Sequence, residues 1–167
     1  KLMSKQSDLV KVSDGTIAGN LDVTSGTIKL DGNYPVGTAN VALGANALGS
    51  NISGQSLTAI GHSALYNNVA IQNTAVGYQA GFTNSTGVEL TAVGYRAGFG
   101  NTSGASNTSF GWGALKTNTT GSSNHAFGSG ALYQNINGND NIALGVNAMG
   151  SNQSGNRNIG MGRSSLV

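Results

Sequence analysis

A 17-residue repeat occupies most of this chain and restricts its fold more than any other feature of the sequence. Each copy centres on a small residue, an apolar residue and a glycine, and eight copies lie between residues 38 and 167, with their glycines spaced by 17, 16, 17, 17, 17, 17 and 17 residues. The central glycines are Gly44, Gly61, Gly77, Gly94, Gly111, Gly128, Gly145 and Gly162. Helical repeats need about 30 residues or more per unit. The period therefore predicts a parallel β-solenoid, in which each coil stacks only on its neighbours.

Asparagine recurs seven residues after the central glycine in every complete copy and indicates where each coil turns. These residues are Asn51, Asn68, Asn84, Asn101, Asn118, Asn135 and Asn152. Asparagine tolerates the left-handed backbone of turns, and stacked asparagine side chains can bond to one another in ladders. We expect each coil to consist of two short strands and two turns, with the asparagines in the turns.

The second repeat is one residue short and shows where the coil tolerates a change of length. It also lacks the glycine that stands ten positions after the central glycine in the other complete copies, and reads Asn68-Val69-Ala70-Ile71 instead. A stacked strand cannot lose a residue without shifting its register, whereas a surface turn can. The deletion is therefore predicted to lie in the turn.

Alternation along each predicted strand divides its side chains between two faces. One face carries a column of large apolar residues, which we expect to form the interior. This large apolar column is Leu43, Ile60, Val76, Val93, Phe110, Phe127, Leu144 and Met161. The other face carries alanine and glycine, so it should meet a strand of the same coil, or another chain, at close range. Burying one large side chain contributes about 1.5–3 kcal/mol, less than the cost of ordering a whole repeat, so we expect partner chains around a shared core.

Composition argues against several classes of function. Only 8 of the 167 residues are lysine or arginine and none is cysteine. We therefore expect no nucleic-acid partner and no thiolate metal site. No apolar run approaches the roughly 20 residues of a membrane span, so this segment should not insert into a membrane. No Ser-His-Asp set, carboxylate pair or phosphate loop can be assembled from local sequence, which predicts no enzyme activity, cofactor or metal.

Residues 1–37 differ from the repeats. They hold four lysines, four aspartates and short alternating runs such as 21–24 and 27–30, separated by Asp-Gly and Ser-Gly pairs. These patterns predict short strands joined by tight turns. We therefore expect two regions, a β-rich connector at 1–37 and an eight-copy β-roll domain at 38–167.

The stretch Asn73-Thr74-Ala75-Val76-Gly77-Tyr78-Gln79-Ala80-Gly81 resembles the repeats of known fibres. Its pattern, Asn-x-Ala-aliphatic-Gly-x-x-Ala, is similar to the head repeat of YadA-like trimeric autotransporter adhesins, although adhesin repeats are usually a few residues shorter. It is closer still to arrays in bacteriophage tail fibres and related bacterial trimeric fibres, which often precede an endosialidase-type chaperone domain. The resemblance implies an all-β fold, a left-handed parallel β-roll assembled as a homotrimer.

The same resemblance implies a structural and adhesive function. The chain would be a segment of a trimeric fibre on a cell surface or a virion, outside the cell, that presents or contributes to the binding of a host or target cell. Its partners would be two identical chains and, at the target cell, a surface glycan or an outer-membrane receptor.

Aromatic residues follow the central glycine in three consecutive repeats, at Tyr78, Tyr95 and Trp112. Exposed, they could stack on sugar rings and make the segment a lateral glycan-binding module. The pattern is more typical of a packed ladder. Where the fourth residue after the glycine is Gly81 or Gly98, a phenylalanine follows, which suggests compensation of volume within such a ladder.

A third hypothesis is a monomeric ice-binding solenoid, which needs an unbroken flat array of threonines. The threonine column lies two residues before the large apolar column. It reads Val41, Thr58, Thr74, Thr91, Thr108, His125, Ile142 and Ile159. Because the array is interrupted at both ends, the sequence argues against this function.

Overall fold

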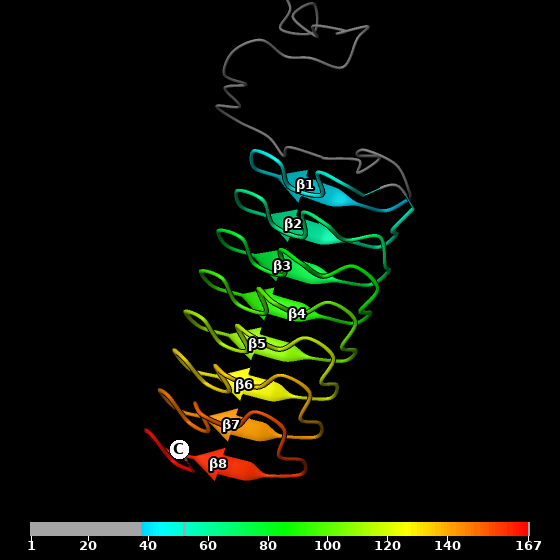
Figure 1. The fold of residues 1–167 in the computed structure, drawn as a ribbon. Helices are drawn as coiled ribbons and strands as arrows, with labels where there is room; N and C mark the ends of the chain where they lie inside the picture. The colour runs from blue at the N-terminus through cyan, green and yellow to red at the C-terminus, as the bar shows by residue number, and fades with distance from the viewer. Residues whose placement is uncertain (1–37, 52, 167) are drawn as a thin grey trace, which may run out of the picture. The chain divides into compact units, whose positions relative to one another are not determined.

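The repeats form one parallel β-sheet of eight short strands, one from each repeat (Figure 1). The structure, a computed structural model, describes residues 38–51 and 53–166, so the strands predicted within 1–37 lie outside the described residues. The strands are β1 (Val41–Leu43), β2 (Thr58–Ile60), β3 (Thr74–Val76), β4 (Thr91–Val93), β5 (Thr108–Phe110), β6 (His125–Phe127), β7 (Ile142–Leu144) and β8 (Ile159–Met161). Each strand pairs with the next along the chain, so every coil is one rung of the stack and the predicted solenoid is confirmed. Rungs are numbered here by their strands.

The short repeat leaves the strand register intact. Ala59 of β2 pairs with Ala75 of β3, as Ala75 pairs with Ala92 of β4. The deletion is absorbed after Asn68, whose side-chain amide donates to the carbonyl of Ala70 at 2.9 Å rather than to a glycine carbonyl three residues on. The prediction that the deletion falls in the turn is confirmed.

Each described coil contains one strand, not the two that the sequence predicted. The opposite wall of the coil also bonds from rung to rung, for example from the amide of Leu65 to the carbonyl of Ala80 at 3.0 Å. However, the residues two and four positions after the central glycine have positive φ, as at Gln79 (54°) and Leu65 (48°). Left-handed residues at alternate positions prevent an extended strand. The wall is therefore a stack of turns.

The two faces of the strand are reversed relative to the prediction. The small residues point into the coil, where Ala59, Ala75 and Ala92 are all 0% exposed. The large apolar column points outward, with Ile60 37% and Leu144 46% exposed. The strand lies so close to the opposite wall of the same coil that only small side chains fit between them. The expected close contact of the small face within one coil is thus confirmed, but the expected apolar interior is wrong.

The larger interior side chains come from the turns. Four residues after the central glycine, the side chain points into the coil and is almost completely buried in rungs 1, 2, 5, 6 and 7. These residues are Leu48, Leu65, Leu115, Leu132 and Met149. All have φ between 48° and 53°. A left-handed conformation costs a non-glycine residue about 1–2 kcal/mol, so burial of these side chains must offset a local strain.

Rungs 3 and 4 fill the same space differently. They carry Gly81 and Gly98 at this position, and the buried Leu90 enters from the other end of the rung 4 strand. A Cβ on Gly81 would lie 3.2 Å from Leu90, and one on Gly98 would lie 3.4 Å from it. The compensation of volume is therefore made inside the coil by Leu90. The prediction that Phe82 and Phe99 make it is wrong, because both rings lie on the outside, half-buried.

The central glycines stack directly on one another. A Cβ on Gly77 would lie 2.5 Å from the carbonyl oxygen of Gly94, and Gly77 has φ of 134°. Any side chain there would both clash and strain the backbone. Glycine at this position is thus required by the distance between rungs.

A ladder of buried asparagines runs through the stack from Asn68 to Asn152. In each rung, the side-chain amide donates to the side-chain carbonyl of the asparagine in the preceding rung, at 2.7–2.9 Å. The same amide also donates to the carbonyl of the glycine three residues on, as Asn118 does to Gly121 at 2.8 Å. The predicted ladder is confirmed. The predicted left-handed backbone is not, because none of these asparagines has positive φ.

A second set of asparagines, four residues before the central glycine, supports the first. Their side chains donate to the same glycine carbonyls at 2.6–2.9 Å. They are Asn40, Asn73, Asn107, Asn124 and Asn141. Leu57 and Leu90 take this position in rungs 2 and 4. The second set therefore alternates with leucine over rungs 1–4 and is asparagine in rungs 5–8, where Asn158 is the last member, whereas the first set has asparagine in every complete repeat.

Replacing Asn118 by alanine should destabilise the fold by about 2–4 kcal/mol. The change removes two donated bonds and one accepted bond in a fully buried setting. Asn137→Ala, at an exposed turn position one rung away, is the control and should cost less than about 0.5 kcal/mol. Thermal unfolding followed by circular dichroism measures both, and equal melting temperatures for the two variants would contradict the role of the ladder.

The pairing of Leu90 with Gly98 predicts rescue by a double change. Leu90→Asn alone should leave a cavity and Gly98→Leu alone should overpack the coil, each costing about 2–4 kcal/mol. Together they reproduce the arrangement of rungs 5–7, in which asparagine before the strand accompanies leucine or methionine after it. The double variant should recover at least half of the summed loss in chemical denaturation. Additive losses would show that the two positions do not share one space.

Candidate functional site: the outward face and its two edges

The outward face of the sheet combines an uninterrupted column of apolar side chains with a column that is threonine or histidine in rungs 2–6. It is formed by the large apolar column together with the threonine column, whose members are half-buried or exposed in all eight strands. Phe110 and Phe127 stack on this face, with ring centroids 5.5 Å apart. The charged residues of the described chain lie outside the strands. A surface of this kind, repeated over eight rungs, is suited to association rather than to catalysis.

The aromatic edge of the sheet begins where each strand ends. Its rings form a continuous stack in which adjacent planes lie within 17° of parallel and centroids are 5.3–6.2 Å apart. In order along the stack, the residues are His62, Tyr78, Tyr95, Trp112 and Tyr133. The three predicted binding residues, Tyr78, Tyr95 and Trp112, are therefore brought together as neighbours. They are 42%, 42% and 53% exposed.

A second stack runs beside the first, through Tyr66, Phe82 and Phe99. Arg96 joins the two stacks, because its guanidinium lies 5.4 Å from the ring centre of Tyr95 and 5.2 Å from that of Phe99. The Nε of Arg96 donates to Gln79 of the preceding rung at 2.9 Å. The arginine is thus held in place by a hydrogen bond and by two aromatic rings.

The stacking changes what Tyr78, Tyr95 and Trp112 could offer to a ligand. Each ring has both faces covered by the rings of adjacent rungs. A sugar stacks on the face of a ring, but here only the ring edges are open to solvent. The packed ladder is therefore the arrangement in this chain, and glycan binding by these residues stays a prediction without a free ring face to support it.

Sequence reasoning missed the fifth ring of the stack. Tyr133 lies in a different column from Trp112, five residues after its central glycine. Its ring reaches Trp112 by passing over Gly113. A Cβ on Gly113 would lie 3.1 Å from the ring of Tyr133. The signal in the sequence was the change from Gln79 and Arg96 to glycine at this position. Lys116 extends the contact by donating to the hydroxyl of Tyr133 at 2.6 Å.

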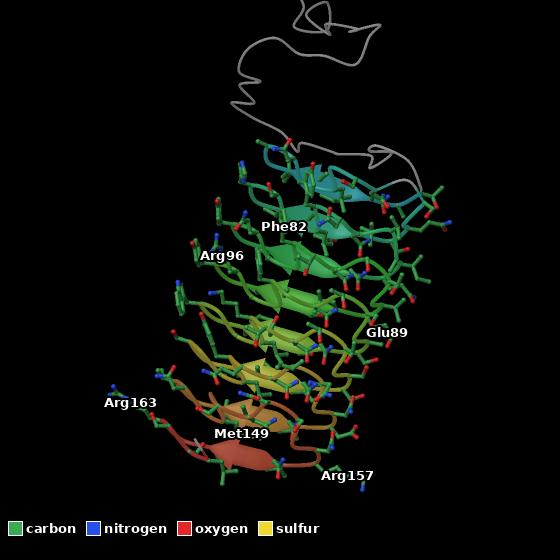
Figure 2. The ribbon with its side chains drawn as sticks, viewed as in Figure 1. Phe82, Glu89, Arg96, Met149, Arg157 and Arg163 are labelled. Carbon is green, nitrogen blue, oxygen red and sulfur yellow. The ribbon has the colours of Figure 1, made fainter. Side chains whose placement is uncertain are left out.

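The turn edge lies at the opposite end of the strands, and there the side chains are small, polar or acidic. It includes the only two carboxylate side chains among the described residues, Glu89 and Asp140. Near its end is a shallow cavity of about 510 Å³. The cavity is lined by Ser122, Ser123, Asn139, Asp140, Asn156 and Arg157. Figure 2 shows Glu89 and Arg157 at this edge, and Arg96 and Arg163 at the other.

The eight central glycines, the other predicted functional positions, lie between the strands and the aromatic edge and serve the stacking of rungs. Within 38–51 and 53–166, His, Cys, Asp and Glu side chains do not gather in groups that could hold a metal ion. In the same ranges, no helix has the length and apolar character needed to cross a membrane. Comparison of the chain with family models, with curated proteins and with solved structures finds no match.

Removing Tyr133 should uncover one face of Trp112, the single tryptophan of the chain. Tyr133→Ala should therefore increase the quenching of tryptophan fluorescence by acrylamide and lower the stability by about 1–2 kcal/mol. Tyr66→Ala is the matched control, because Tyr66 occupies the same position of its repeat but stacks on Phe82. It should leave the quenching unchanged. Equal quenching in the two variants would contradict the continuous stack.

Proposed function

We propose that this segment is a structural and adhesive part of a homotrimeric fibre, in which the outward faces of three identical chains pack around a common axis. The observation that carries the proposal is the apolar face itself, which runs over all eight rungs with Leu43 42% and Leu144 46% exposed. A contiguous apolar patch of several hundred Å² on a protein surface often marks an interaction site.

A second copy of the chain is the partner that fits this face best. Rungs in a parallel sheet repeat about every 4.8 Å, and a partner must match that period over eight strands to cover the face evenly. An identical solenoid has the same period by construction. The strands all point one way, so parallel copies related by rotation about the stack axis keep equivalent rungs at the same level.

Rotation about an axis parallel to the stack brings the two different edges of adjacent sheets together, and the number of three chains comes from the resemblance to trimeric fibres. One edge is aromatic and the other is a turn edge with the carboxylates of Glu89 and Asp140. A contact between unlike surfaces is heterologous, and it closes into a ring when copies are related by rotation. A ring of three chains is the smallest that places three sheet faces around one axis.

The left-handed winding, the position outside the cell and the role in host or target-cell recognition come from the resemblance to YadA-like heads and tail fibres. The stacked rungs support such a role physically. Buried asparagines bond in every rung from Asn68 to Asn152 and resist extension or bending of the stack. A fibre of this kind holds a binding surface away from its anchor on a cell surface or a virion.

Charges placed on the outward face should prevent assembly. We expect the wild-type chain to have the mass of three chains in light scattering. Ile60→Lys with Leu144→Lys, both outward-facing, should raise the dissociation constant at least about a hundredfold, because an unpaired charge buried near the axis costs about 3 kcal/mol or more.

The matched control carries the same charges away from the face, as Ser103→Lys with Ser151→Lys at exposed turn positions. It should assemble like the wild type. A folded wild-type chain that remains a monomer at all concentrations would overturn the proposal.

A further inference from the structure

The outward face alone is too small to hold a trimer together. Eight strands of three residues present on the order of 400 Å², taking about 4.8 Å between rungs and about 3.3 Å per residue. A stable interface buries about 800 Å² on each partner. If the proposed trimer is correct, surfaces beside the face must therefore take part in the contact.

The charges of the described residues are segregated between the two edges. The aromatic edge carries three cations, Arg96, Lys116 and Arg163, and no carboxylate. The turn edge carries both carboxylates, Glu89 and Asp140, together with Arg157. No ion pair forms within this part of the chain, although Ser106 donates to Glu89 at 2.7 Å. One edge is therefore basic and the other is weakly acidic, and neither is neutralised within its own chain.

The apolar residues of the two edges also occur at matching levels. On the turn edge, Ile71, Val88 and Ala105 stand three residues before β3, β4 and β5, and serine or asparagine takes this position before β6, β7 and β8. On the aromatic edge, rings follow β2 to β5, and non-aromatic residues follow β6 to β8. Rungs 3, 4 and 5 thus carry an apolar residue on the turn edge and an aromatic ring on the other edge, where Tyr133 extends the stack into rung 6.

We propose that each chain docks its aromatic edge against the turn edge of the next copy. The inference rests on the proposed trimer. When three sheets face a common axis, unlike edges of adjacent chains meet, and parallel chains bring equal levels together. Ile71, Val88 and Ala105 of rungs 3–5 then cover the exposed ring edges of Tyr78, Tyr95 and Trp112, and Glu89 comes to lie opposite a cation.

The levels of the charges fit this contact. Glu89 precedes β4 and Arg96 follows it, so on adjacent chains in register they face each other. With neighbouring edges offset by one rung, Glu89 faces Lys116 and Asp140 faces Arg163 instead. Both arrangements place Glu89 opposite a cation, but only the offset one pairs Asp140, because in register Arg157 and Arg163 of rung 8 face each other.

Charge exchange between the edges tests the contact. The basic-edge variant carries Arg96→Glu and Lys116→Glu, the acidic-edge variant carries Glu89→Lys and Asp140→Lys, and a third variant carries all four changes. Dissociation constants are measured by sedimentation equilibrium in low salt. Each two-residue variant should dissociate at least tenfold more readily than the wild type, because three contacts are affected in every trimer. The four-residue variant should return to within about threefold of the wild type.

A control variant, Gln134→Glu with Ser151→Glu, makes the chain more negative, as the basic-edge variant does, but at exposed positions away from both edges. It should assemble normally. If the wild type is a trimer and the two-residue variants assemble as well as it does, the edge contact is wrong while the trimer stands. Failure of the four-residue variant to recover also overturns the contact. A monomeric wild type removes the proposed function and this inference with it.

Discussion

The bond between one buried asparagine and the same asparagine in the next rung governs the rest of this structure. Asn101, Asn118 and Asn135 each donate to the rung before and accept from the rung after, at 2.7–2.9 Å. A buried amide without partners is costly, so every rung must keep the distance and orientation that satisfy its neighbours. The close stacking of the central glycines follows from the same short separation, since a Cβ on Gly77 would meet the backbone of Gly94.

The narrow coil that this ladder defines explains why apolar residues lie on the outside. The small residue of each strand faces the opposite wall directly, and the remaining space of a rung takes one larger side chain, or two in rung 2, where Leu57 and Leu65 are both buried. The large apolar column therefore has no place within its own coil. In the proposed trimer, this outward column becomes part of the interface between chains, and association contributes to the stability of the fold.

The sequence predicts the repeat, the parallel stack, the asparagine ladder and the position of the deletion, because each depends only on period and residue type. It does not predict which face of the strand points into the coil, because alternation divides the side chains between two faces without showing which of the two is the inner one. Leu48 and Leu65 were also beyond prediction, because leucine rarely adopts positive φ and nothing local marks these residues as left-handed. At the candidate site, the neighbouring positions of Tyr78, Tyr95 and Trp112 followed from the period, whereas the covering of Trp112 by Tyr133 depends on a contact between two columns.

Folding and assembly should be coupled in this chain, because an isolated coil gains little from its own interior. A leucine such as Leu115 contributes about 1.5–3 kcal/mol by burial but loses about 1–2 kcal/mol to its left-handed backbone, so its net gain is small. In rungs 3 and 4, Gly81 and Gly98 replace the strained residue, and Leu90 supplies the volume without positive φ. The asparagine ladder and the ring stacks join successive rungs along the stack. They do not contribute contacts perpendicular to the stack axis. In the proposed trimer, lateral stability comes from the outward face and its edges, where the exposed apolar strand residues and the charged side chains of the described residues are found.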